Sequence, residues 1–452
     1  MAPSMTTPEA LMLTQALAAL RDAILSSVEN GWQRVEVAVA PVDIKSFLEA
    51  QRAHPLVYWQ DRSGRQETGG LGIAHEIRMD AQDFSRCDAA LRAVLDRGAA
   101  GARYFGGSSF AGACRGREWR GFPATWFVLP RVEINRQGRR MLLAVNFHND
   151  AAGQEDRRAA LRVLDGIRDV LAPAAAPAVT MARGRDLPPQ AVWGDIVRGI
   201  LGEIGKGPIT KIVLARRTDL TLSAALHPLE ILRAYQKVTP GCFHFLFQPS
   251  AEEAFLGASF ERLYKRSGAR LWTEAIAGTR PRGASAVEDK ALEAELLNDP
   301  KERLEHRHVV DAIHESLLSL LKENVADDVP VVEKFSDSQH LVSRFECVLA
   351  PDVTDGSILE RLHPTPAVAG TPTMEAMARI AAVEAFDRGW YAGPVGWIGW
   401  DEAEFAVAIR SGLLRGKEFS VFAGAGIVAG SDPQREWAEV ELKIGNILKA
   451  LS

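Results

Sequence analysis

The chain has little cysteine and lacks any long uninterrupted apolar segment. Its four cysteines, Cys87, Cys114, Cys242 and Cys347, lie far apart and form no C-x-x-C pair, which argues against a disulfide framework and against a zinc knuckle. No positive charge precedes Arg21, unlike in a signal peptide, and polar residues interrupt every apolar run short of a membrane span. We therefore expect a cytoplasmic protein that does not enter a membrane.

The chain also lacks a strong charge of either sign. Its 452 residues include 53 Lys and Arg against 58 Asp and Glu, a formal net charge of −5. Such a balance does not indicate nucleic acid or an anionic membrane as the main partner. We expect a small-molecule substrate, and we expect the chain to be a monomer.

Helical and strand-like segments divide the chain into two parts. Residues 8–28 predict a helix, and short segments rich in β-branched and aromatic residues predict strands at 35–39, 71–77, 104–110, 126–129 and 141–147. The Ala- and Pro-rich stretch 171–190 lacks periodicity and predicts a connection between an N-terminal and a C-terminal half. We therefore divide the chain into an N-terminal lobe, 1–190, and a C-terminal region, 191–452.

The second part continues the mixture of helices and strands. Its predicted helices are 191–206, 229–238, 286–321 with an interruption at Pro300, and 433–451. Its predicted strands are 212–216, 243–248, 254–259 and part of 263–276, followed by a strand-rich segment before the last helix. This irregular order favours an α+β fold over a regular alternation of strand and helix.

Two predicted helices begin in the same way, with Asp at the N-cap and Pro at the first helical position: DPKERLE from Asp299 and DPQREWAE from Asp432. Each pattern places two glutamates three residues apart, on one helix face: Glu302 with Glu305, and Glu436 with Glu439. If the two faces met, the carboxylates would need a cation, and oxygen ligands suit Mg²⁺. Acidic residues are also typical of ordinary helix starts, where they favour the helix dipole.

Three further side chains are candidates for acid, base or substrate contacts. Lys211 precedes the apolar segment IVLA, and a desolvated lysine there has a lowered pKa and can act as a base. Glu261 follows the strand-like FLGAS and is a candidate general acid. Both also fit solvated side chains at strand ends, and His340 fits either a substrate donor or a structural histidine.

Familiar motifs of other enzyme classes are absent or incomplete. The sequence contains no G-x-S-x-G, Walker loop or H-E-x-x-H motif. GAGIVA from Gly424 fits the dinucleotide fingerprint, but only one helix and no further strand are expected after it. An oxidoreductase is therefore disfavoured.

A series of ordered segments resembles the chorismate-utilising enzymes, the family of isochorismate, anthranilate, aminodeoxychorismate and salicylate synthases. The matching segments are KIVLAR from Lys211, FLGASFERL from Phe255, TEAIAGTRPR from Thr273, KERLEH from Lys301, LHPTPAV from Leu362, GWYAGPVG from Gly389, FAVAIRS from Phe405, AGAGIVAGSDP from Ala423 and EWAEVELK from Glu436. YFGG from Tyr104 extends the resemblance into the N-terminal lobe, toward the isochorismate synthase branch.

The resemblance implies a fold and a set of residue roles. The fold is α+β with two lobes, antiparallel sheets packed face to face, helices outside and the active site in the cleft. Chorismate is the implied substrate and Mg²⁺ the implied cofactor, held by Glu305 and Glu439 with Glu302 and Glu436 beside them. Lys211 is the implied base that activates water, and Glu261 the implied acid. The remaining residues resemble groups that contact the substrate: Gly278, Thr279, Tyr391, Arg410, Gly424, Gly426 and Lys443 at its carboxylates, and His340 and Ala367 at its ring.

Two positions favour isochorismate synthase within the family. Amine-using members lack a base lysine at the place of Lys211, and anthranilate and salicylate synthases typically have Thr where this chain has Ala367. Family members usually have Pro immediately before the acid, whereas this chain has Phe260. No glutaminase partner is expected. A salicylate synthase and a chorismate-binding protein without turnover stay open as alternatives, as does the use of the product for menaquinone, a siderophore or salicylate.

Overall fold

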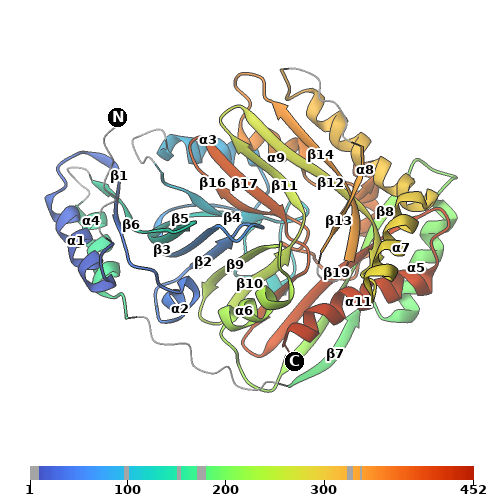
Figure 1. Cartoon of the computed structure of the whole chain (residues 1–452), viewed down its shortest axis with the longest axis horizontal. Helices are drawn as coiled ribbons and strands as arrows, with labels where there is room; N and C mark the ends of the chain where they lie inside the picture. The colour runs from blue at the N-terminus through green and yellow to red at the C-terminus, as the bar shows by residue number, and fades with distance from the viewer. Residues whose placement is uncertain are drawn as a thin grey trace.

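The computed structural model describes residues 10–95, 101–149, 154–169, 180–322, 329–335 and 338–451, and Figure 1 shows the whole chain. Its helices are α1 (Leu13–Ser26), α2 (Ile44–Glu49), α3 (Phe84–Leu95), α4 (Gln154–Asp165), α5 (Gln190–Glu203), α6 (Pro228–Val238), α7 (Ala286–Asn298), α8 (Pro300–Leu318), α9 (Asp355–Leu362), α10 (Thr373–Val383) and α11 (Pro433–Leu451).

Its strands are β1 (Gly31–Ala38), β2 (Leu56–Gln60), β3 (Gln66–Met79), β4 (Tyr104–Ser108), β5 (Thr125–Gln137), β6 (Arg140–Asn149), β7 (Met181–Leu187), β8 (Lys211–Leu222), β9 (Phe243–Ser250), β10 (Glu253–Ser259), β11 (Arg262–Ser267), β12 (Arg270–Pro281), β13 (Val331–Lys334), β14 (Ser338–Val348), β15 (Gly370–Thr371), β16 (Pro394–Ile398), β17 (Glu402–Val407), β18 (Ser411–Arg415) and β19 (Glu418–Val428).

These strands join into one antiparallel network with two arms that start at β5. The first arm runs from β5 through β4, β16, β17, β11, β12 and β14 to β13. The second arm runs from β5 through β3, β2, β9, β10, β18 and β19 to β8, whose other edge pairs with β7 and β15. Strands β1 and β6 extend the sheet beside β5.

The two arms pack against each other through aromatic side chains. Strands β4 and β16 of the first arm and β2 and β9 of the second surround a small interior void. The rings of Trp126 in β5 and Phe247 in β9 lie 4.8 Å apart between centroids, and Trp390, in the segment before β16, contacts Phe247 at 5.3 Å. Such contacts add to the hydrophobic burial that holds two sheet faces together. The α+β fold with facing antiparallel layers, predicted from the resemblance, is confirmed.

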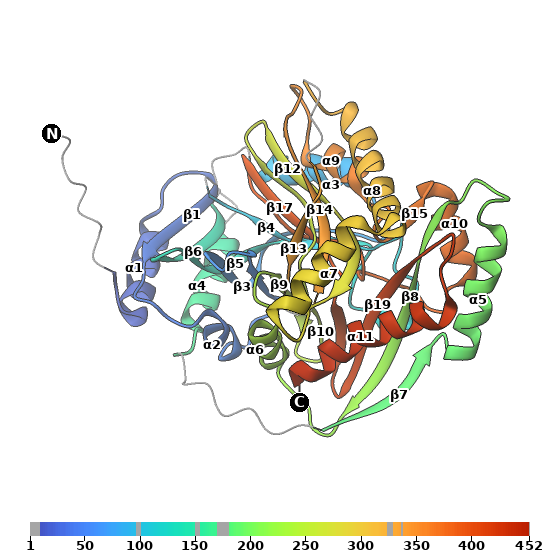
Figure 2. The ribbon, with the colours of Figure 1, turned by 45° about the vertical axis from the view of Figure 1, so that its right-hand side comes forward.

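Helices lie at the periphery of the molecule, where they cover the sheet. Helix α8 packs on β12, and α11 lies along β19 (Figure 1). After the turn of 45° in Figure 2, α11 crosses in front of β19 and β8. The two helices that were predicted to begin with Asp-Pro therefore pack on different arms of the sheet.

The helix starts follow the sequence closely. The Asp299 side chain accepts hydrogen bonds from the N–H groups of Lys301 and Glu302, and Asp432 accepts from those of Gln434 and Arg435. Proline follows each aspartate at the first helical position, where its missing N–H has no intrahelical partner to lose. These caps fix where α8 and α11 begin, and so where their glutamates lie.

Two predictions of secondary structure were wrong or incomplete. The stretch 171–190 was expected to be a connection; residues 171–179 lie outside the described part of the chain, but β7 lies in the remainder and pairs with β8. Tertiary pairing gives this polar segment a strand that its composition does not indicate. The sequence analysis also did not identify five helices: α2, α3, α4, α9 and α10.

Strands from both sides of residue 190 pair directly, as β2 does with β9 and β4 with β16. The division at residue 190 stays a prediction. Among the described residues, no helix combines the length and the apolar character needed to cross a membrane.

Candidate active site

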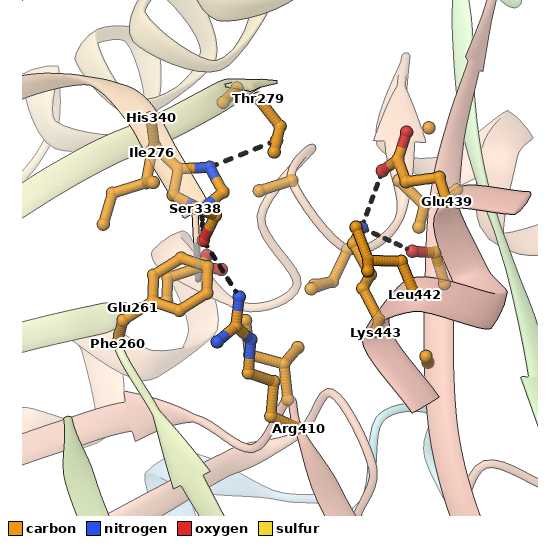
Figure 3. Close-up of a pocket in the computed structure, with 18 of the residues that line it drawn as sticks. Phe260, Glu261, Ile276, Thr279, Ser338, His340, Arg410, Glu439, Leu442 and Lys443 are labelled. Atoms are coloured by element: carbon orange, nitrogen blue, oxygen red, sulfur yellow. Dashed lines mark hydrogen bonds and ion pairs between the residues drawn. The ribbon is translucent and has the colours of Figure 1, made fainter. Parts of the chain in front are cut away.

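Both arms of the sheet contribute to a cavity of about 420 Å³. Its wall includes β12 and β14 of the first arm, β8 and β19 of the second, and helices α8 and α11. Figure 3 shows Phe260, Glu261 and His340 on one side, and Glu439 and Lys443 on the other. Most residues that the sequence analysis singled out line this cavity: Lys211, Glu261, Gly278, Thr279, Glu305, His340, Ala367, Tyr391, Arg410, Gly424, Gly426, Glu439 and Lys443.

Glu261 is a buried carboxyl group between β10 and β11. Its side chain accepts a hydrogen bond of 3.5 Å from the Thr365 hydroxyl, and only 6% of the residue is exposed. Burial, with a smaller contribution from the negative charge of Glu274, raises the pKa of Glu261 from 4.5 to about 8. Glu261 therefore carries a proton at neutral pH, which is the state that a general acid needs.

Lys211 begins β8 and is almost completely buried. Its ammonium group lies 2.9 Å from Oε1 of Glu305, on α8. Burial, the largest single effect, would raise the pKa of Glu305, but the charge and hydrogen bond of Lys211, together with the charges of Lys301 and Lys443, bring this pKa below its ordinary value. Gly426 makes room for this pair, because a Cβ there would lie 2.9 Å from the Glu305 carboxylate and 3.2 Å from Cε of Lys211.

Glutamates of α8 and α11 lie close enough to influence one another. Burial and the charge of Glu305 raise the pKa of Glu302, while burial and the charge of Glu439 raise the pKa of Glu436. Glu302 and Glu436 do not line the cavity, and Lys301 lies 3.6 Å from Glu436. Side-chain cations therefore offset part of this negative charge.

These carboxylates fit a magnesium ion by their chemistry. The donor set is all oxygen, and its mutual repulsion would be relieved by a divalent cation. In the described part of the chain, however, no three acidic, His or Cys side chains converge as a ready metal site. Binding of Mg²⁺ would thus require side-chain movement, and the roles of the four glutamates stay predictions.

Cationic and polar groups surround the remainder of the cavity. Lys443 donates to the Gly424 carbonyl and to Glu439, each at 2.8 Å. Arg410 has a positive φ of 49°, a strained backbone conformation that is uncommon for a residue with a side chain. These two cations face a space that also contains apolar residues, an arrangement suited to a small anion with an apolar body.

Phe260 forms an aromatic platform beside these groups. Its ring stacks on His340 at 4.7 Å between centroids, and the Arg410 guanidinium lies 4.7 Å from its centroid. The Ser338 hydroxyl hydrogen-bonds to both Arg410 and His340, and the Thr279 hydroxyl bonds to His340. Phe260, which stands where family members usually have Pro, therefore contacts both His340 and Arg410, two residues predicted to bind the substrate.

The sequence analysis missed several groups that support this site. Thr365 lies in the LHPTPAV segment that carried the resemblance, and Ser338 stands two residues before His340. The sequence could therefore have identified both residues. Arg62 and Glu274, which form an ion pair beside Glu261, were not identified. Arg62 is separated by 212 residues from Glu274, and no local pattern marks it.

Comparison with known proteins identifies the family. The family model described as chorismate binding enzyme matches residues 18–452. The chain belongs to the chorismate-binding enzyme family. The isochorismate synthase MenF of Haemophilus influenzae is 33% identical over 442 residues, which cover 96% of each chain. This family membership confirms the resemblance that the sequence motifs indicated.

Solved structures of family members agree with the fold. The menaquinone-specific isochorismate synthase MenF from Escherichia coli has a TM-score of 0.89 and 29% identity, covering 97% of this chain and 100% of that one. Anthranilate synthase component I from Streptococcus pneumoniae, 21% identical with a TM-score of 0.65, covers 94% of this chain and 93% of its own and shares the fold. The chorismate-binding enzyme fold thus extends over nearly the whole chain.

Proposed function

We propose that this chorismate-binding enzyme is a magnesium-dependent isochorismate synthase. The observation that carries the proposal is the pair of buried groups that line one cavity: Glu261, whose burial raises its pKa, and Lys211 beside Glu305. Two relatives named isochorismate synthase align over 96% and 97% of the chain, which supports the same reaction.

In the proposed reaction, Lys211 acts as the neutral amine, released from its ion pair with Glu305 and with its ammonium proton lost to solvent. The amine accepts a proton from a water molecule, which attacks ring carbon 2 of chorismate. The ring double bonds shift, and the hydroxyl at carbon 4 leaves as water after it receives the proton of Glu261. One water enters and one leaves, so the product is an isomer of the substrate. Lys211 ends with one additional proton and Glu261 with one fewer, and exchange with solvent restores both. Each role contributes a factor of about 10²–10⁴ in rate.

Other residues hold the substrate in this orientation. Arg410 and Lys443 provide positive charge for the carboxylates, with backbone groups near Gly278 and Gly424. Magnesium held by Glu305 and Glu439, with Glu302 and Glu436 behind them, would neutralise a carboxylate of the substrate. Holding a small rigid ring at both ends orients it for reaction, and such positioning lowers the activation free energy by a large amount.

The alternative is a salicylate synthase, which forms isochorismate and then expels pyruvate. Ala367 lines the cavity, so its small side chain contributes to the shape that the ring meets. Expulsion of pyruvate needs a substrate pose in which the hydrogen at carbon 2 approaches the enolpyruvyl group. We propose that the pose here leaves that side chain intact.

The test supplies chorismate and Mg²⁺ together with lactate dehydrogenase and NADH. Absorbance of NADH should hold steady until an isochorismatase is added, and should then fall. Chromatography should identify isochorismate before that addition. Immediate oxidation of NADH by the purified protein, with salicylate accumulating at the same rate, would refute the proposal in favour of a salicylate synthase.

We also propose that the enzyme is a cytoplasmic monomer that needs no glutaminase partner. Light scattering after size-exclusion chromatography tests the first statement, since a mass well above 49.3 kDa would contradict it. Full activity of the isolated chain without glutamine tests the second.

A further inference from the structure

An ion pair between the N-terminal lobe and β12 lies next to Glu261. Arg62, in the loop between β2 and β3, donates from Nη1 and Nη2 to the two carboxylate oxygens of Glu274 at 2.7 and 2.9 Å. The Glu274 side chain is 2% exposed and that of Arg62 is 15% exposed. A bidentate pair of this kind is geometrically specific, because two parallel bonds fix the relative orientation of both groups.

The same ion pair holds the backbone on both sides of Glu261. The carbonyl of Phe260 accepts a hydrogen bond of 2.8 Å from Nη1 of Arg62. The N–H of Arg262 donates to Oε1 of Glu274 at 3.0 Å. The two peptide groups that flank the Cα of Glu261 are therefore anchored to one rigid unit, and their orientation determines where the Glu261 carboxyl points.

We infer that Arg62 and Glu274 are positioning residues for Glu261, and that through them the N-terminal lobe sets the orientation of the catalytic acid. The inference rests on the proposed function, because it assumes that Glu261 donates a proton to the substrate. Neither residue lines the cavity, so neither contacts the substrate. A displacement of about 1 Å at a reacting group can cost about a hundredfold in rate.

The pair also controls charge near the acid. Glu274 is a negative neighbour that raises the pKa of Glu261, an effect second to burial. The titratable groups that face Glu261 come from several elements: Glu274 of β12, Lys211 of β8, Lys443 of α11, and Tyr391. Arg62 offsets the charge of Glu274, so loss of Arg62 and loss of Glu274 should shift the pKa of Glu261 in opposite directions.

The test compares Arg62→Leu, Arg62→Lys and Glu274→Gln with a matched control, Arg34→Leu. Arg34 forms another buried pair with Glu133 at 2.9 Å, and neither residue lines the cavity or contacts residues 260–262. We expect Arg62→Leu to lower kcat by about 10- to 100-fold with KM changed by less than about threefold. Arg62→Lys should recover part of kcat, because it keeps the charge but not the bidentate geometry.

The pH dependence separates positioning of Glu261 from a general loss of structure. We expect the alkaline limb of the pH profile of kcat/KM to move to higher pH in Arg62→Leu and to lower pH in Glu274→Gln. Arg34→Leu should leave this limb in place and change only the Tm. The inference is overturned if Arg62→Leu retains kcat within about twofold, if the control loses as much activity, or if the two variants move the limb in the same direction or not at all.

A second readout keeps this inference distinct from the proposed function. In the unliganded protein, the infrared C=O band of protonated Glu261 can be identified by subtracting the spectrum of Glu261→Gln. The pH midpoint of this band's titration should be higher in Arg62→Leu and lower in Glu274→Gln than in the wild-type protein. An inactive wild-type protein would refute the proposed function, while the infrared titration would still measure the effect of the ion pair on Glu261; an unshifted infrared titration in an active enzyme would refute only the role of the ion pair.

Discussion

Replacement of Glu261 by Gln tests the acid at the centre of the proposed mechanism. Glutamine has nearly the same shape and keeps an acceptor for the Thr365 hydroxyl, but its amide cannot donate a proton as a carboxylic acid does. We expect kcat to fall by about 10²–10⁴ while chorismate still binds, since Glu261 acts on the leaving hydroxyl rather than anchoring the carboxylates. Product analysis and calorimetric titration with chorismate measure the two quantities.

The same variant should change how stability depends on pH. Burial and the charge of Glu274 raise the pKa of Glu261 to about 8, so the folded chain keeps a proton that the unfolded chain releases above about pH 4.5. The free energy of unfolding therefore falls as pH rises through this window and levels off above about pH 8. Each pKa unit corresponds to about 1.4 kcal/mol, which gives a decline on the order of 5 kcal/mol.

Urea unfolding of the wild-type protein and Glu261→Gln at intervals between pH 5 and pH 9 measures this decline. The variant should lack it and should be more stable than the wild-type protein at the alkaline end, because a neutral amide replaces a buried charge. Parallel stability curves for the two proteins, or near-normal turnover by the variant, would show that Glu261 is not the buried acid described here.

Three further substitutions test the other parts of the site. Glu439→Ala should lose Mg²⁺-dependent activity and keep its fold; an unchanged Mg²⁺ titration of activity would rule out this ligand. Lys211→Ala should abolish isochorismate formation but leave chorismate binding measurable by calorimetry, and near-normal turnover would remove Lys211 from the mechanism. Phe260→Leu should raise KM by about two- to tenfold, because the cation–π contact that holds Arg410 is lost; an unchanged KM in steady-state kinetics would contradict this role.

The parts of the fold that could be predicted are those with local causes. The Asp-Pro starts of α8 and α11 define caps within a few residues, and the structure begins both helices at the proline that follows each aspartate. The apolar run IVLA after Lys211 likewise marks the start of β8, and burial on both faces explains why these four consecutive residues are hydrophobic.

Features that depend on distant partners could not be predicted in this way. Strand β7 is polar and mostly exposed, and only its pairing with β8 makes it a strand. No local sequence pattern marks Arg62, because its role depends on the ion pair with Glu274, which lies on a strand of the other arm. The sequence motifs supplied the candidate acid and base. The charged groups next to each of them are determined by the tertiary fold.

The arrangement of the arms has a consequence for how the chain folds. Lys211 lies opposite Val428 in the β8–β19 pair, and β2 and β4 pair with β9 and β16 far along the chain. Such non-local pairing gives a high contact order, so folding should be slow, because the entropy cost of closing long loops precedes the contacts that stabilise the closed form. The acid, the base and the glutamates come together only after these closures. On refolding, enzymatic activity should therefore return later than the helical content, and incompletely closed sheets should be the species most exposed to aggregation.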